Sequence, residues 1–360
     1  MHTKTHIVLI CLLLCAVPLC AQESPAEHTQ QAQSSKWLIV PGAFYTPETS
    51  LGLGGGVFYF LDCCSLSQGD RQSYLGVNAI YTFKDQVQFA FIPKLYLTDR
   101  WLLRGKATAR DFPAEFYGIG NNTAETGETY TQQAYAFSLT VLRRVASNLY
   151  AGVTADYQHH DTRDVQPGGL LEQELALTDA NQLGGLGLVV EYDSRDSEFF
   201  PRRGSYHQLT AYRFFSGMGD AAFTQYQVDA RRYLSPAQDH ILALQLYLAA
   251  TNGDVPYFRL PMLGGANLLR GIYKGRFRDK ALAALQVEYR RKLWRKLYLV
   301  VFAGTGLVAP EISDFRFNGL KYSMGAGLRY RVAGQGVNLR LDFGYGEGDG
   351  QVYFGVMEAF

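Results

Sequence analysis

Arg270 is the strongest candidate for a functional residue in this chain, because of its residue type and its sequence surroundings. It lies in a glycine-rich segment between Tyr257 and Leu293. A buried guanidinium is costly unless it meets a carboxylate, and Glu288 on the following segment is the candidate partner. Glycines on both sides of Arg270 let the backbone bend; they are Gly253, Gly264, Gly265, Gly271 and Gly275. We therefore predict a contact between Arg270 and Glu288.

Two other groups have residue types that could serve catalysis or binding, and neither is well supported. His159-His160-Asp161 with Asp164 could hold a divalent metal, but no regular strand or helix spacing supports the cluster, so a solvated polar loop is favoured. The glycine-rich run at residues 52–56 continues as an apolar strand and opens no helix, which argues against a nucleotide loop. The chain also contains no G-x-S-x-G nucleophile motif. The sequence predicts no catalytic residue, no metal site and no cofactor.

The composition narrows the class of protein. Hydrophobic residues make up 47% of the 360 residues and aromatic residues 14%, with 37 glycines and 12 prolines, so the chain is neither disordered nor a helical membrane protein. The formal net charge of +1 gives no indication of a nucleic-acid partner. After the N-terminal segment, no apolar run is long enough for a spanning helix. A membrane protein of this composition would have to be a closed β-barrel.

The N-terminus has the pattern of a secretory signal peptide. Lys4 precedes an apolar run over residues 7–17, and a small residue after that run offers a cleavage site. We expect residues 1–21 to be the signal peptide and residues 22–35 to be a polar periplasmic linker. Cys20 leaves a lipid anchor open as an alternative, although the leucine before it is unfavourable for lipidation.

From residue 36 onward, apolar residues alternate with polar or small ones at the period of a β-strand. Residues 337–345 are the clearest case, because Val, Leu, Phe and Tyr point one way and Asn, Arg and Asp the other. So many charged and bulky residues on the polar face favour a wide, wet lumen with lipid outside over a soluble sandwich. We predict an all-β fold, a 16-stranded antiparallel transmembrane β-barrel over residues 36–360, located in the outer membrane.

Turn clusters give the expected strand boundaries and orientation. An even number of strands places both termini on the periplasmic side, and Trp37, Trp101 and Trp294 then fall at periplasmic strand ends, as in an interfacial aromatic belt. Basic runs at these ends, including residues 290–292, are expected to reach lipid headgroups. The predicted strands are 36–46, 51–62, 72–83, 86–98, 101–111, 130–145, 148–158, 182–195, 205–216, 222–234, 240–251, 279–293, 296–308, 320–333, 336–346 and 351–360.

Several motifs, in order along the chain, resemble the BamA/TamA superfamily of outer-membrane barrels, the bacterial surface antigen type. Residues 269–273, Leu-Arg-Gly-Ile-Tyr, resemble the sixth outer loop of that family. Residues 44–49 resemble its first hairpin and residues 116–121 a recurrent third-loop motif. A stronger match is to the D-x-R-D…F-P-x-x-G periplasmic turn, on Asp193, Asp196, Pro201 and Gly204. The resemblance covers about residues 37–360.

The resemblance implies that Arg270, Gly271 and Tyr273 form a plug loop that folds back into the lumen, where Arg270 meets carboxylates of the inner wall. Two features depart from the family. Gly304 stands where the family has an aspartate that helps to hold the arginine. We expect no periplasmic POTRA domain ahead of the barrel, and therefore expect a separate periplasmic adaptor to dock the substrate.

The expected function is that of a monomeric, non-enzymatic barrel that assists the insertion or passage of polypeptide or lipid. Its expected partners are outer-membrane lipid and an adaptor or unfolded outer-membrane protein. Two alternatives stay open: a passive diffusion porin and a structural surface antigen.

The seam between the first and last strands is a candidate lateral opening. Pro41 removes a ladder donor and Gly42 adds no side-chain packing where the chain must close against residues 352–360. Phe360 matches the aromatic ending by which barrel strands are commonly recognised for assembly. A simple strand irregularity at Pro41 is an equally good interpretation.

Overall fold

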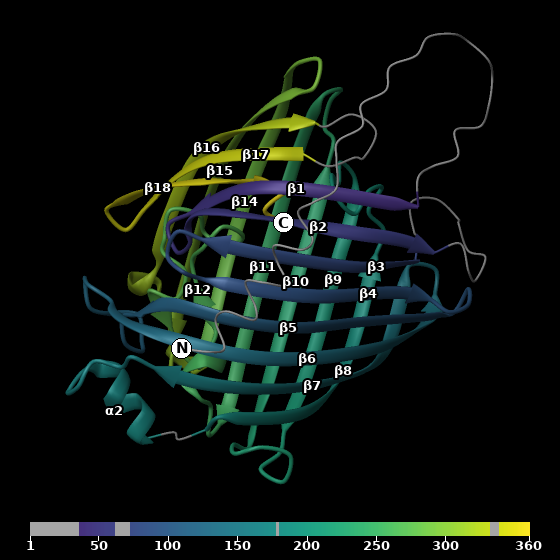
Figure 1. The fold of residues 1–360 in the computed structure, drawn as a ribbon. Helices are drawn as coiled ribbons and strands as arrows, with labels where there is room; N and C mark the ends of the chain where they lie inside the picture. Colours follow the sequence, from purple (N-terminus) through teal and green to yellow (C-terminus); the bar gives the residue numbers. More distant parts are fainter. Residues whose placement is uncertain (1–35, 62–72, 178–179, 332–337) are drawn as a thin grey trace.

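The computed structural model describes residues 36–61, 73–177, 180–331 and 338–360. Sixteen strands in these residues pair antiparallel with their neighbours, and the last strand closes against the first (Figure 1). The predicted all-β, 16-stranded antiparallel barrel is confirmed. The predicted signal peptide and linker lie outside the described residues.

The barrel strands fall where the alternating pattern predicts them. They are β1 (Trp37–Thr46), β2 (Ser50–Leu61), β3 (Ser73–Thr82), β4 (Val87–Tyr96), β5 (Trp101–Phe116), β6 (Glu128–Ala146), β7 (Leu149–Arg163), β8 (Gln182–Asp193), β9 (Gly204–Phe214), β10 (Phe223–Leu234), β11 (His240–Gly253), β14 (Ala281–Trp294), β15 (Leu297–Ala309), β16 (Lys321–Arg331), β17 (Asn338–Gly346) and β18 (Asp349–Val356). The largest differences in length are in β5 and β7, which extend beyond the predicted strands at the end of the barrel where β11 and β14 are connected. We call this the outer end and the opposite one the inner end.

The side chains of β17 show how the pattern builds the wall. Buried and exposed residues alternate along the strand. Leu341 and Phe343 are exposed on the outside, whereas Asp342 between them is buried inside. Because an outer apolar surface is stable only against lipid, the same alternation that fills the lumen with polar groups makes the exterior suit a membrane. No helix in the described residues is long and apolar enough to span a membrane.

The three tryptophans lie at the inner end, as predicted. Trp37 begins β1, Trp101 begins β5 and Trp294 ends β14, and all three side chains are exposed. An amphipathic ring at this height suits the boundary between lipid and water.

The histidine cluster is not the loop that the sequence predicts. His159, His160 and Asp161 lie inside β7, where His160 pairs with Ala134 of β6 and is buried. Its ring stacks on Phe258 at a centroid distance of 3.8 Å. The prediction failed because the pairing of β6 with β7 continues well past the predicted end of that strand. No group of three or more His, Cys, Asp or Glu side chains in the described part of the chain is placed to hold a metal ion.

The outer end carries the long connections. Helix α2 (Leu170–Leu177) lies there beyond the ends of β6 and β7 (Figure 1), and the Glu128 carboxylate accepts hydrogen bonds from the Leu170 and Leu171 amides at its first turn. The connection from β11 to β14 contains η1 (Tyr257–Arg259) and a small sheet of β12 (Met262–Leu263) with β13 (Phe277–Arg278). The connection between β15 and β16 contains η2 (Ile312–Asp314) and η3 (Phe317–Gly319).

Candidate functional site

The connection between β11 and β14, which contains Arg270, folds into the barrel; we call it the plug loop. Leu263, Leu269, Ile272 and Phe277 of this loop form one buried apolar cluster with wall residues. The wall side of that cluster is Ala249, Leu282, Ala284 and Val308. Apolar packing therefore fixes the loop against β11, β14 and β15.

Glycine is required at the tip of the plug loop. Gly271 has a φ of 108°, in the left-handed region that favours glycine. A Cβ on Gly271 would lie 2.7 Å from backbone atoms of Tyr345 in β17. The amide of Gly271 also donates a hydrogen bond of 3.0 Å to the Tyr353 hydroxyl of β18. The loop backbone thus lies directly against the last strands of the barrel.

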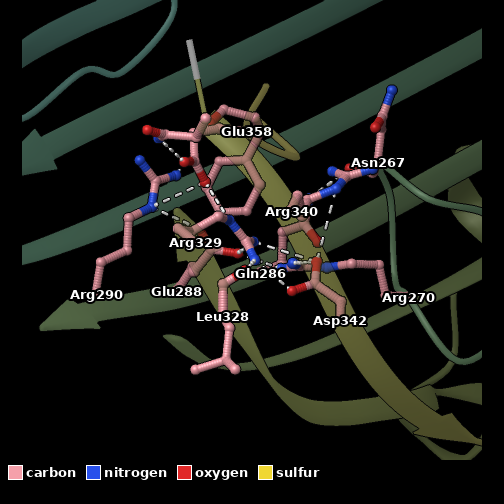
Figure 2. Close-up of polar contacts among 12 residues, drawn as sticks. Asn267, Arg270, Gln286, Glu288, Arg290, Leu328, Arg329, Arg340, Asp342 and Glu358 are labelled. Carbon is pink, nitrogen blue, oxygen red and sulfur yellow. Dashed lines mark hydrogen bonds and ion pairs between the residues drawn. The ribbon is translucent and has the colours of Figure 1, made fainter. Parts of the chain in front are cut away.

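Arg270 extends from this tip between two carboxylates of the inner wall (Figure 2). Its Nη2 lies 2.5 Å from Oε2 of Glu288, and its Nη1 lies 2.5 Å from Oδ2 of Asp342. Its guanidinium carbon lies 3.5 Å from the centroid of the Phe302 ring, a cation–π contact. The structure therefore brings Arg270 and Glu288 together as the sequence predicts, and adds Asp342 as a second acid.

The two acids belong to a larger buried network that we call the charge cluster. Arg329 of β16 lies 2.5 Å from Asp342, 3.4 Å from Glu288 and 2.8 Å from Glu358. Arg290 lies 2.6 Å from Glu288. The charge cluster thus holds three arginines and three carboxylates, namely Arg270, Arg290, Arg329, Glu288, Asp342 and Glu358 (Figure 2). Because every charge has an opposite neighbour, the network is held together strongly, and removal of one member leaves an uncompensated buried charge.

Arg340 is the exception beside the charge cluster. It is buried and lies 3.8 Å from Asp342, but its Nε and Nη1 have no hydrogen-bond partner in the described residues. Asp342 already accepts shorter contacts from Arg270 and Arg329. Arg340 therefore adds excess positive charge at the edge of an otherwise balanced cluster.

Gly304 explains the departure from the family pattern. A Cβ at this position would lie 2.4 Å from Cδ2 of Leu269, the residue before Arg270. An aspartate at position 304 would therefore displace the plug loop, and the acid that holds Arg270 comes from Asp342 on β17 instead. The alternation of residues 337–345 had already placed Asp342 on the polar face, but nothing in the sequence showed that it meets Arg270.

Tyr273 lies further along the plug loop, away from the charge cluster. Its ring packs on the Tyr117 ring at a centroid distance of 5.5 Å, which links the loop to the β5–β6 connection. Burial raises the pKa of the Tyr273 phenol, and the Glu115 and Glu48 carboxylates raise that pKa further. The Tyr273 phenol is therefore neutral and lies where the plug loop packs on the β5–β6 connection.

The periplasmic turn motif forms a compact turn between β8 and β9. Asp193 accepts hydrogen bonds from the Arg195 guanidinium, and Oδ1 of Asp196 accepts the amides of Arg202 and Arg203 at 2.8 and 3.2 Å. Gly204 has a φ of 101°, and a Cβ there would lie 2.2 Å from the Ser194 carbonyl oxygen. These contacts explain why the turn requires aspartate at positions 193 and 196 and glycine at position 204.

The turn also reaches the charge cluster. Arg290 donates a hydrogen bond of 3.5 Å to the Pro201 carbonyl. Arg290 was expected to reach lipid headgroups with its neighbours, and that expectation is wrong because its side chain is buried inside the barrel. The period of two places Arg290 on the same face as Glu288, and this signal was present in the sequence.

In the described part of the chain, the seam between β1 and β18 is joined by one paired position, Tyr45 with Phe354, whereas β1 pairs with β2 at ten positions. If this antiparallel register is extended, Ala43 stands opposite Val356, the last residue of β18. Residues 37–42, which include Pro41 and Gly42, therefore lie beyond the end of β18. Residues 38–42, in the inner half of the seam, have no partner on β18 in the described residues.

Phe360 is not at the seam, and the predicted strand over residues 351–360 is wrong in its last part. The chain leaves β18 at Met357, whose φ is 67°, and turns into the lumen. Glu358 then contacts Arg329, while Phe360 packs in a buried cluster with Tyr233 and Ala243. The carboxylate of Glu358 is stabilised by cations inside the barrel and would be costly in the lipid-facing wall, so the strand ends before it.

The fold and the plugged, charge-lined lumen define the class as a transmembrane β-barrel of the outer-membrane type. Residues 71–360 match the model of the Omp85 superfamily domain, so the chain belongs to the Omp85 superfamily. No curated protein matches the chain by sequence.

Solved structures give the same fold. BamA from Haemophilus ducreyi lacking POTRA domains 1–3 is similar with a TM-score of 0.63 and 16% identity, over 90% of this chain and 70% of that one. CdiB from Escherichia coli is similar with a TM-score of 0.61 and 13% identity, over 89% and 62% of the two chains. CdiB from Acinetobacter baumannii gives 0.57 and 13%, over 89% and 59%. This chain therefore spans less than two thirds of the CdiB chains.

Proposed function

We propose that this barrel assists the insertion or passage of polypeptide or lipid at the outer membrane, and that its route is the β1–β18 seam. The observation that carries the proposal is the difference between the two ways in which the barrel is closed. A packed loop and a balanced charge cluster occupy the lumen, whereas the seam is joined at one position in the described residues. A separate periplasmic protein that delivers the substrate is part of the proposal.

A disulfide across the seam tests the route. Tyr45→Cys with Phe354→Cys joins the one paired position, in a background where Cys63 and Cys64 are serine. The matched control joins β9 to β10 through Ala211→Cys with Tyr226→Cys, which are also Cα partners. The readout is the abundance of other outer-membrane proteins in a deletion strain that carries each variant.

Oxidation of the seam variant should impair function, reducing agent should restore it, and the control pair should have no effect. Full activity of the oxidised seam variant would reject the seam as the route. Conductance of the purified barrel in a planar bilayer distinguishes the passive porin, because a large and stable open current contradicts a plugged lumen. A structural surface antigen would show no conductance, and its deletion would leave other outer-membrane proteins unchanged.

A further inference from the structure

A cavity of about 900 Å³ lies beside the plug loop within the barrel. Its wall runs from Arg195 and Pro201 of the inner turn to Glu48 of the β1–β2 turn at the outer end. This volume is within the range of small-molecule sites, which is roughly 300–1,000 Å³.

The cations of the cavity wall fall into two groups. At the inner side, Arg195 is paired with Asp193 at 2.9 Å and Arg231 with Asp229 at 2.5 Å. Such pairs leave little net charge for a ligand. The other group, Arg110, Lys274 and Arg278, has no ion pair within the described residues, and we call it the cationic wall.

Arg278 is the strongest member of the cationic wall. It is buried, with 2% of its surface exposed, and its Nη1 has no hydrogen-bond partner in the described residues. Its Nε donates to the Gly275 carbonyl at 3.2 Å, and its guanidinium lies 5.0 Å from the centroid of the Phe116 ring. A buried guanidinium with only neutral contacts is unfavourable unless an anion completes its shell.

Arg110 is connected to Arg278 through a chain of neutral contacts. Its Nη2 donates a hydrogen bond of 2.7 Å to Oε1 of Gln132. The Nε2 of Gln132 in turn donates a hydrogen bond of 3.1 Å to the Tyr257 hydroxyl. The Tyr257 ring packs on Phe116, the ring beneath Arg278. Arg110 thus contacts an amide oxygen where a carboxylate would be expected.

Lys274 completes the wall, and its exposed side chain makes the site reachable. Two carboxylates also line this part of the cavity, and neutral groups already contact both. Glu48 accepts the backbone amide of Lys274 at 2.8 Å, and Glu115 accepts the Tyr117 hydroxyl. Three cations therefore face two acids that other hydrogen bonds occupy.

We propose that the cationic wall binds the phosphate of a phosphorylated sugar, either free or as the headgroup of a lipid. Two guanidinium groups and one ammonium group suit an anion with two charges and several acceptor oxygens. The amides of Gln86 and Gln132 and the hydroxyls of Tyr130 and Tyr273 line the same cavity and suit a hydroxyl-rich body. This site is independent of the proposed route through the seam.

The test is calorimetric titration of the purified full-length mature barrel in detergent micelles with glucose 6-phosphate, with glucose as the uncharged comparison. Glucose 6-phosphate should bind, and glucose should bind at least tenfold more weakly. Arg278→Gln should weaken phosphate binding at least tenfold. Because Arg278 is buried, Lys274→Gln, at an exposed side chain, is the second variant that keeps the test valid if the first does not fold.

The matched control removes a cation from the same cavity without changing the net charge. Arg231→Gln with Asp229→Asn should leave glucose 6-phosphate binding within about twofold of the original. Equal binding of glucose and its phosphate, or equal binding by Lys274→Gln and the original barrel, would overturn the proposal. Micelles that contain lipid A distinguish the two sources: competition with glucose 6-phosphate that Lys274→Gln removes identifies a lipid headgroup, and no competition identifies a free sugar phosphate.

Discussion

The plug loop and the β1–β18 seam both close this barrel, but by different physical means. The plug loop is fixed by buried apolar packing and by Arg270 between Glu288 and Asp342, all of them within the lumen. The seam depends on backbone pairing, and in the described residues Tyr45 with Phe354 is its one paired position. Breaking a buried charge network costs several kcal/mol, because it leaves uncompensated charges in the lumen, whereas opening a strand edge with little pairing breaks few hydrogen bonds. We therefore expect the β1–β18 seam to open before the plug loop leaves the lumen.

The largest expected effect comes from removing the cation that the plug loop contributes to the charge cluster. Arg270→Ala removes one of the two guanidinium groups that bridge Glu288 and Asp342, the other being that of Arg329, and should lower the free energy of unfolding by about 3–5 kcal/mol. Urea unfolding of the barrel in lipid vesicles, followed by tryptophan fluorescence, measures the change.

Arg316→Ala is the matched control. Arg316 lies in the exposed β15–β16 connection, where its Nη1 donates only to the backbone carbonyls of Ser313 and Phe315. Its removal should change stability by less than about 0.5 kcal/mol. Equal effects of the two substitutions would show that the charge cluster does not stabilise the plug.

A single methyl group at the loop tip should have the next largest effect. Gly271→Ala forces a non-glycine residue to a φ of 108° and places a Cβ 2.7 Å from the Tyr345 backbone. The combined strain should cost roughly 2–4 kcal/mol and shift the loop out of the lumen. The urea midpoint should fall, and bilayer conductance should rise as the lumen opens.

Gly265→Ala is the comparison for that loop shift. Gly265 also has a positive φ, of 96°, but its Cβ would meet only the flexible side chain of Lys274. Its cost should be smaller, near the roughly 1–2 kcal/mol of the backbone conformation alone, without added conductance. Open-channel currents of equal size in both variants would contradict the role of the Gly271 contact.

The strands of the barrel wall could be predicted from the sequence, whereas most contacts within the lumen could not. A period of two is a local signal, so it gave all sixteen strands and placed Asp342 on the inner face. The contact between Arg270 and Glu288 was predictable because glycines surround Arg270 and Glu288 lies on β14, the barrel strand that follows the plug loop. Asp342 joins Arg270 from 72 residues away along the chain, and only the closure of the barrel brings them together. Phe360 was misplaced for the same reason, because the cations that draw Glu358 inward lie on other strands.

Amide exchange gives a direct comparison between the seam and a fully paired region. Seam-facing amides of residues 38–42 have no partner on β18 in the described residues and should exchange at least about tenfold faster than those of β10, which pairs with β11 along its whole length and with β9 at every residue except Leu234. Exchange in detergent micelles, read by mass spectrometry of peptic fragments, measures the difference. Protection of residues 38–42 equal to that of β10 would show a seam closed along its length.

The smallest effect is expected at the turn between β8 and β9, which supports the charge cluster from the inner end. Asp196→Ala removes the acceptor of the Arg202 and Arg203 amides and should lower stability by about 1 kcal/mol, the net value of such hydrogen bonds. Asp196→Asn retains an acceptor oxygen and should recover most of that loss. Because Pro201 in this turn accepts a hydrogen bond from Arg290, a loosened turn also frees one side of the charge cluster. In urea unfolding, the double variant Asp196→Ala with Arg270→Ala should therefore lose less stability than the sum of the losses in the two single variants. Strict additivity would show that the turn and the plug loop are energetically independent.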